Sequence, residues 1–118
     1  MGKKMKVIPQ PYVVARLVKN IIQWHHDRNL IKGSTDKDQL AKLVQEMGEL
    51  SDSICKEKDV RDDIGDMIVV LLNIAERNNV TLEECLDQAW NDIKDRKGRM
   101  VDGIFIKEGD DDELADVE

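Results

Sequence analysis

Apolar residues recur three and four positions apart through four stretches of the chain, and this spacing predicts four amphipathic helices. The predicted ranges are about 11–25, 36–55, 59–75 and 81–96. Pro11 suits the first turn of a helix, and either Ser34 or Thr35 can cap the second helix. Thr81 with Glu84 forms a capping box that opens the fourth helix.

The third predicted helix is apolar nearly all round between residues 64 and 75. A helix on the surface of a monomer cannot bury such a circumference, so we expect another subunit to cover it. The sequence therefore predicts an all-α, four-helix bundle completed by oligomerisation, as a homodimer or homotetramer. We expect a single domain over residues 1–108, with its core at about 12–100 and a short extended segment within 101–107. The acidic residues 109–118 are expected to be disordered.

Composition and charge narrow the range of partners. The chain has 118 residues, 41% of them hydrophobic, which is enough for one small domain. Its formal net charge of −7 argues against binding of duplex nucleic acid, which needs a basic surface. The longest apolar run, 67–72, is far too short to cross a bilayer, and no secretory signal pattern opens the chain. We therefore expect a cytoplasmic protein with no membrane partner, in which Cys55 and Cys85 are reduced thiols.

One short pattern occurs twice: acid, apolar residue, glycine, acid, apolar residue, at 46–50 and again at 63–67. Carboxylates three positions apart lie about 60° apart around a helix and about 4.5 Å apart along it, so each pair can aim at one point. Glycine inside a helix costs about 1 kcal/mol relative to alanine, and its repetition indicates a close approach there. Because 36% of the residues are charged, acid pairs at this spacing also arise by chance on solvated helix faces.

The connection between the second and third predicted helices is short, so these helices run antiparallel. Glu49 and Asp66 lie equally far from the turn, and Glu46 and Asp63 lie within about one helical turn of them. Four carboxylates at one level repel each other unless cations lie between them. The pattern is therefore a hypothesis of metal binding, and oxygen ligands of this kind suit Mg²⁺ or Mn²⁺.

Residues about 20–100 resemble the MazG-like, all-α nucleoside triphosphate pyrophosphohydrolases. That family carries an ExxE pair, a short helical hairpin and an ExxD pair, which match Glu46-x-x-Glu49 and Asp63-x-x-Asp66 here. Asp63 departs from the pattern, because the family has glutamate there; the shorter side chain would place this ligand further out or have it act through a water. Further matches are the step from Gly65 to Asp66, Asn73 and the polar stretch 91–99.

The resemblance implies that Glu46, Glu49, Asp63 and Asp66 hold Mg²⁺ ions that bridge the phosphates of a nucleotide. It also implies attack of water on the α-phosphorus, giving nucleoside monophosphate and pyrophosphate, in the house-cleaning of nucleotide pools. Which acid accepts the proton of the water stays open. Two alternatives stay open as well: a phosphoribosyl-ATP type of pyrophosphohydrolase, and a non-catalytic helical interaction protein that binds metal or nucleotide.

Several residues outside the acid pairs are candidates for substrate binding: Trp24, Asn73, Asn91, Lys94, Arg96, Lys97 and Arg99. The four cations could meet phosphates, although basic residues at the end of a helix also simply complement its dipole. Trp24 could stack on a base or belong to the core. The asparagines could bind a sugar hydroxyl or orient a ligating carboxylate, or they could satisfy buried positions between subunits. The first interpretation is favoured for Asn73.

Overall fold

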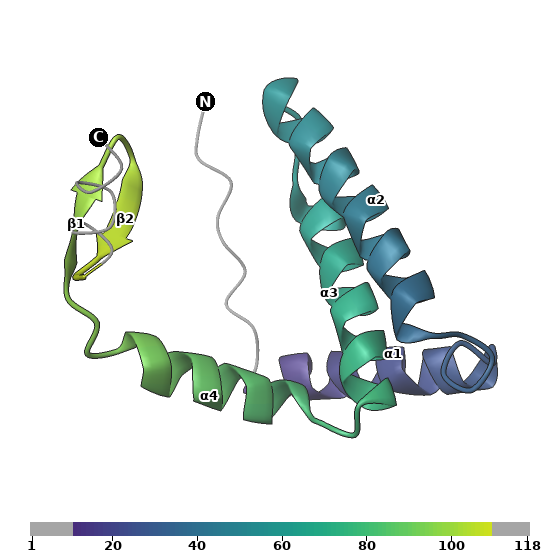
Figure 1. Cartoon of the computed structure of the whole chain (residues 1–118). Coiled ribbons are helices and arrows are strands. Elements are labelled where there is room, and N and C mark those ends of the chain that lie inside the picture. The colour runs from purple at the N-terminus through teal and green to yellow at the C-terminus, as the bar shows by residue number, and fades with distance from the viewer. Residues whose placement is uncertain (1–10, 110–118) are drawn as a thin grey trace. The chain divides into compact units, whose positions relative to one another are not determined.

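The computed structural model describes residues 11–109 and contains four helices followed by two strands (Figure 1). The elements are α1 (Val13–Asp27), α2 (Asp36–Cys55), α3 (Arg61–Arg77), α4 (Leu82–Ile93), β1 (Gly98–Val101) and β2 (Ile104–Lys107). The prediction of an all-α fold is confirmed. The chain divides into two compact units, residues 1–82 and 83–118, and the packing of α4 against the first three helices stays a prediction. The predicted disordered tail lies outside the described residues, apart from residue 109.

Helices α2 and α3 form an antiparallel hairpin that starts where the capping signal predicts (Figure 1). The Thr35 hydroxyl accepts the N–H of Asp38 at 3.1 Å, and the Asp38 carboxylate accepts the N–H of Thr35 at 3.1 Å. This reciprocal pair satisfies two N–H groups that a helix otherwise leaves free. Helix α3 begins at Arg61, two residues later than predicted, because Asp59 uses its carboxylate to accept the N–H of Arg61 and so lies outside the helix.

Helix α1 crosses the hairpin and packs against α3, with which it shares a buried polar network (Figure 1). His25 and Asn73 are both buried, and the amide Nδ2 of Asn73 lies 3.2 Å from Nδ1 of His25 and 3.0 Å from the carbonyl of Leu30. The Nε2 of His25 lies 2.9 Å from the carbonyl of Val69. Since Val69 offers only an acceptor, Nε2 carries the proton and Nδ1 accepts from Asn73. These groups form the asparagine network, beside the buried Leu72.

Arg77, in the last turn of α3, organises the connection between α1 and α2. Its guanidinium donates to the carbonyls of Leu30, Ile31 and Ser34, and its Nε donates to the Asp36 carboxylate at 3.0 Å. A planar guanidinium with five N–H groups can serve several acceptors of one loop at once. Arg77 therefore ties the start of α2 to the end of α3, at the opposite end of the hairpin from the turn.

The second unit combines α4 with a β-hairpin. Helix α4 ends at Ile93 rather than near Arg96, and the chain then enters two antiparallel strands with Arg99 opposite Ile106. Asp102 and Gly103 make the turn with φ of 50° and 82°, which is the pattern of a tight two-residue hairpin. A Cβ on Gly98 would lie 2.1 Å from the carbonyl of Ile106, so this strand start requires glycine. The expected extended segment is thus one strand of a hairpin.

The hairpin of α2 and α3 leaves much apolar surface uncovered within the chain. The exposed residues fall at helical spacing on both helices: Leu40, Val44, Met47 and Ile54 on α2, and Ile64, Ile68 and Leu71 on α3. A Cβ on Gly48 or Gly65 would meet no atom within 4 Å. The expectation of a close approach at these glycines is therefore wrong for the described part of a single chain.

Among the described residues, no helix is long and apolar enough to span a membrane.

Candidate metal centre

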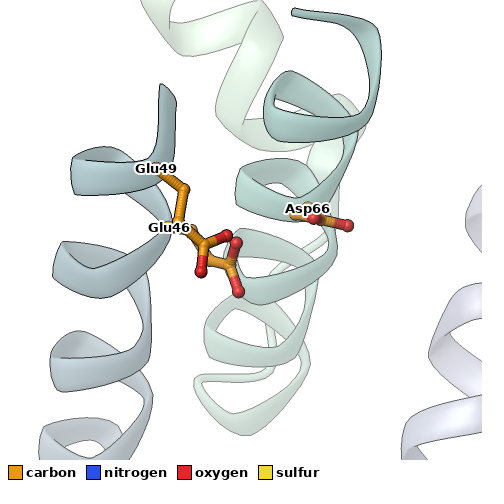
Figure 2. Close-up of side chains that lie close together, drawn as sticks. All are labelled: Glu46, Glu49 and Asp66. Atoms are coloured by element: carbon orange, nitrogen blue, oxygen red, sulfur yellow. The ribbon is translucent and has the colours of Figure 1, made fainter. Parts of the chain in front are cut away.

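Three carboxylates converge between α2 and α3. Glu46 and Glu49 come from α2 and Asp66 comes from α3, and one oxygen from each lies within 4.8 Å of the others. Figure 2 shows the two glutamate carboxylates side by side between the ribbons, with Asp66 on the facing helix. We call these three residues the carboxylate cluster. The antiparallel hairpin produces it as the spacing predicts, because residues equally far from the turn meet at one level.

Glu46 is the buried member of the carboxylate cluster, with a relative exposure of 5%. Its Oε1 lies 3.0 Å from the Nζ of Lys42, one turn earlier on α2. Its Oε2 is buried and has no hydrogen-bond partner in the described structure. A buried carboxylate oxygen without a partner is costly, and native proteins rarely leave one. This oxygen is therefore available for a ligand.

Neighbouring groups shift the pKa values of all three carboxylates in the cluster. The hydrogen bond from Lys42 lowers the pKa of Glu46 below its ordinary value. A protonated Glu49 can donate a hydrogen bond to Glu46, and this bond, followed by the negative charge of Glu46, raises the pKa of Glu49. Desolvation, followed by the charges of Asp62, Glu46 and Asp63, raises the pKa of Asp66. Like charges held together disfavour ionisation, so the protein stores electrostatic repulsion that a cation would relieve.

A hard divalent cation fits this donor set. All three side chains offer carboxylate oxygens, which Mg²⁺ and Mn²⁺ prefer, and the unpartnered Oε2 of Glu46 is the atom that a cation would complete. Beside the hydrogen bond with Glu46 that raises the pKa of Glu49 and the desolvation that raises the pKa of Asp66, charge repulsion contributes to both, and a positive ion would remove this contribution. Glu46, Glu49 and Asp66 are thus the residues that would hold the ion.

Asp63, the fourth predicted carboxylate, does not belong to the three-residue group. It is half-buried, and its charge contributes to the raised pKa of both Glu49 and Asp66. Asp63 therefore lies close enough to act on the cluster electrostatically. The structure brings together three of the four predicted acids, and the departure from the family pattern falls on the one that stands outside.

Trp24 is 42% exposed, so the interpretation as a core residue does not hold within the described chain. The guanidinium of Arg28 lies over its ring, 4.4 Å from the centroid, and the His25 ring meets it edge-on at 5.3 Å. A cation over the face of an indole and an aromatic edge against it are both favourable arrangements. Trp24 is consequently an accessible aromatic whose position is supported by His25 on α1 and by Arg28 directly after this helix.

Asn73 has no accessible surface, and its Nδ2 is engaged by His25 and Leu30. A side chain buried in this way does not reach a nucleotide in this arrangement, which weighs against substrate binding; that interpretation stays a prediction. The structure supports the alternative of a buried polar position, although Asn73 joins α1 to α3 within one chain and not two subunits. Its Oδ1 remains without a hydrogen-bond partner among the described residues.

The other predicted substrate contacts lie in the second unit. Asn91 is on α4, Lys94, Arg96 and Lys97 follow this helix, and Arg99 is on β1. Arg96 pairs with Asp92 at 2.9 Å. The sequence predicted that these cations lie in the last turn of a helix. In the structure they lie in the connection from α4 to the β-hairpin and in its first strand. Because these residues follow the helix and do not belong to its last turn, a favourable interaction with the helix dipole is a weaker explanation for their positive charge.

The sequence analysis did not identify two residues of the first unit that contact the site or position its helices. Lys42 touches the carboxylate cluster, and Arg77 ties the α1–α2 connection to α3. Lys42 carried a signal, because a lysine four residues from a glutamate lies beside it on a helix. Arg77 carried none, since its acceptors lie more than 40 positions away in the chain.

An all-α fold with an acidic cluster on a helical hairpin is the arrangement that the resemblance to MazG-like pyrophosphohydrolases predicts. The model of the MazG nucleotide pyrophosphohydrolase domain matches residues 34–101, and the chain belongs to this family. It is also 43% identical over 67 residues to an uncharacterised 18.2 kDa protein of the rep–hol intergenic region of Haemophilus phage HP1. The match covers 55% of this chain and 41% of that relative's length. No solved structure matches the chain.

Proposed function

We propose that this protein hydrolyses a nucleoside or deoxynucleoside triphosphate between the α- and β-phosphates, releasing nucleoside monophosphate and pyrophosphate in a Mg²⁺-dependent reaction. The observation that carries the proposal is the buried, unpartnered Oε2 of Glu46 within the carboxylate cluster. Family membership supports the class of reaction. House-cleaning of the nucleotide pool in the cytoplasm is the role that we propose for it.

The proposed mechanism assigns the side chains simple tasks. When bound, a divalent ion neutralises phosphate charge, orients the phosphate chain and makes water a better nucleophile. Glu46, Glu49 and Asp66 would hold and orient this ion through their carboxylate oxygens. Asp63, which stands outside the group of three, acts on it through charge or through a water. The proton of the attacking water passes to one of these four carboxylates, and no covalent nucleophile is needed.

Substrate contacts outside the cluster are also part of the proposal. Trp24 presents an exposed indole that can stack on a nucleotide base, with Arg28 already on one part of the ring. Lys94, Arg96, Lys97 and Arg99, with Asn91 beside them, are proposed to meet the phosphates. Arg96 is engaged by Asp92 and would have to exchange that partner for a phosphate.

We also propose that the protein works as a homodimer or homotetramer. The exposed apolar stripes of α2 and α3 support this, because a contiguous apolar face of a soluble helical hairpin marks an interface. Two helices from each of two subunits would bury these stripes in a shared core. Light scattering on the purified protein measures the number of subunits directly, and a monomer at micromolar concentration would contradict the proposal.

One observation favours a second candidate function. Asp63 lies outside the three-residue group, so the cluster has one ligand fewer than the family pattern. A non-catalytic protein that binds metal or nucleotide for assembly would tolerate this loss, whereas an enzyme must hold the phosphates in register. A pyrophosphohydrolase of the phosphoribosyl-ATP type remains the alternative within the enzyme class.

The deciding experiment measures products. The protein is incubated with each common nucleoside and deoxynucleoside triphosphate, and separately with phosphoribosyl-ATP, each with and without Mg²⁺. Monophosphate, pyrophosphate and orthophosphate are then quantified separately. We expect equal amounts of monophosphate and pyrophosphate, and only with metal. Turnover of phosphoribosyl-ATP alone would move the assignment within the enzyme class, and metal-dependent assembly without any product would support the non-catalytic function.

A further inference from the structure

Lys42 places a positive charge on the buried glutamate of the carboxylate cluster. Its Nζ lies 3.0 Å from Oε1 of Glu46, and the pair joins a lysine side chain that is 49% exposed to a glutamate side chain that is only 7% exposed. Residues four positions apart lie side by side on a helix, and the flexible four-carbon stem of a lysine lets its ammonium reach a partner one turn away. Lys42 is therefore a surface residue whose charge serves an interior carboxylate.

A second lysine–carboxylate pair, at the C-terminal end of α2, differs from this one in its exposure to solvent. Lys56 and Asp52 have the same separation in sequence and a distance of 2.9 Å, but both of their side chains are 56% exposed. Solvent screens an exposed pair of this kind, which typically contributes little. Glu46 has lost most of its hydration, so its charge depends on the partner that the fold supplies.

Lys42 contacts only one of the two carboxylate oxygens of Glu46. The ammonium contacts Oε1, while Oε2 has no partner among the described residues and Glu49 and Asp66 lie nearby. A divalent cation on the cluster would bring two positive charges next to the ammonium of Lys42. Like charges a few ångströms apart repel, so the cation and Lys42 compete for Glu46.

We propose that Lys42 is a displaceable cation of this site: it neutralises Glu46 in the metal-free protein, leaves when a divalent ion binds, and then contacts a phosphate oxygen of the nucleotide. This inference rests on the proposed function, because it takes the carboxylate cluster as the metal centre. A lysine ammonium is a mobile point charge with three donors, which suits both partners in turn. The substrate class that it recognises is a metal-bound diphosphate or triphosphate.

The proposal predicts effects of opposite sign on two binding constants. In Lys42→Met, which keeps the length of the side chain but not its charge, Mn²⁺ alone should bind about fivefold more tightly, because a competing charge is gone. Pyrophosphate in complex with Mn²⁺ should bind about tenfold more weakly to the same variant, because one charge-assisted contact is lost. Free Mn²⁺ is counted by electron paramagnetic resonance, and pyrophosphate binding is followed by calorimetry.

Three further variants make the result interpretable. Lys42→Arg keeps the charge and should stay within about twofold of the natural protein in both measurements. Lys56→Met removes a lysine from the exposed pair on the same helix and should change neither constant. Glu46→Gln removes a proposed ligand and should abolish tight Mn²⁺ binding. Circular dichroism confirms that each variant has the same helix content.

The outcomes separate the inference from the function on which it rests. If the natural protein binds Mn²⁺ and Glu46→Gln does not, the metal centre stands. If Lys42→Met then weakens both ligands, Lys42 only supports the structure, and if it behaves like Lys56→Met, the pair is an ordinary surface contact; either result overturns the inference alone. Failure of the natural protein to bind Mn²⁺, or unchanged binding in Glu46→Gln, overturns the proposed metal centre itself.

Discussion

Helix α3 takes part in two polar clusters that are built in opposite ways. Near its C-terminal end, the asparagine network joins neutral groups, and every donor of Asn73 and His25 meets an acceptor. Oδ1 of Asn73 has no hydrogen-bond partner among the described residues, but this oxygen carries no charge. Near its N-terminal end, Asp66 belongs to the carboxylate cluster, in which charged groups of one sign meet and a buried oxygen of Glu46 has no partner. The first arrangement holds α1 in place, whereas the second is complete only when something is added.

The difference teaches how to tell structural from functional polar groups. A buried network whose donors are satisfied stabilises one packing of the helices, because breaking it leaves unpaired groups inside. A cluster of like charges opposes its own formation, and such an arrangement persists where function requires it. The two clusters should therefore respond differently to mutation: the carboxylate cluster through activity and the asparagine network through stability.

The largest expected effect separates the two clusters through activity. Glu49→Gln should lower turnover by roughly 100-fold or more, because it removes a ligand charge from the metal centre. The helical fold should persist, since Glu49 is exposed. Steady-state rates of pyrophosphate release, with circular dichroism alongside, test this. Asp52→Asn, which removes an exposed acid one turn further along α2, is the matched control; unchanged turnover in Glu49→Gln would sink the proposed site.

The reverse experiment addresses the asparagine network. Asn73→Leu should lower the free energy of unfolding by about 2 kcal/mol, because Nδ1 of the buried His25 loses its donor and the carbonyl of Leu30 keeps only Arg77. Binding of Mn²⁺ by the folded variant should change little, since Asn73 does not touch the carboxylate cluster. Urea unfolding measures the first quantity. An exposed amide, Gln88→Leu on α4, serves as control, and equal stability of the two variants would contradict the role given to Asn73.

The pH dependence of stability should carry the signature of the carboxylate cluster. The raised pKa values of Glu49 and Asp66 mean that these groups stabilise the metal-free fold at low pH, and that this contribution is lost as pH rises through their raised pKa values. The lowered pKa of Glu46 acts in the opposite direction, since its contribution is lost as pH falls through that value.

This sign can be tested with Glu49→Gln in the absence of metal. At neutral pH the variant should melt at a higher temperature than the natural protein, because one repelling charge is gone, and the difference should vanish below about pH 4. Thermal unfolding followed by circular dichroism across pH gives the answer. Addition of Mg²⁺ should reverse the order of the two proteins at neutral pH. A variant that melts lower without metal would show that Glu49 stabilises the fold.

The smallest expected effect concerns the glycines that precede Glu49 and Asp66. Gly48→Ala and Gly65→Ala should each raise the free energy of unfolding by about 0.5–1 kcal/mol, because the added methyl groups meet no atom within 4 Å and alanine favours the helix. The asparagine network has no such glycine beside it. Urea unfolding with light scattering is the measurement. Loss of stability together with loss of the oligomer would show that another subunit packs against these positions.

Local patterns in the sequence were sufficient to predict that the helices exist and roughly where they lie, but not where each one begins and ends. The apolar spacing located α1, α2 and α3 to within a few residues, and Thr35 caps α2 as predicted. The boundaries failed where a side chain intervened: Asp59 delays α3. They failed also where a hairpin competed, since the segment from Gly98 pairs with Ile104–Lys107 and α4 stops at Ile93. Helical propensity cannot anticipate a partner strand.

Residue types and spacing by themselves determined the helical class of this protein and the four acids that can meet across the α2–α3 hairpin. In an antiparallel pair of helices, residues equally far from the turn lie at the same level along the helix axes. Only the tertiary structure decided which of those acids converge, that Glu46 is buried, and that Asn73 is buried rather than exposed to a nucleotide. These features depend on rotation about the helix axes and on contacts between residues more than 40 positions apart, neither of which a local pattern encodes.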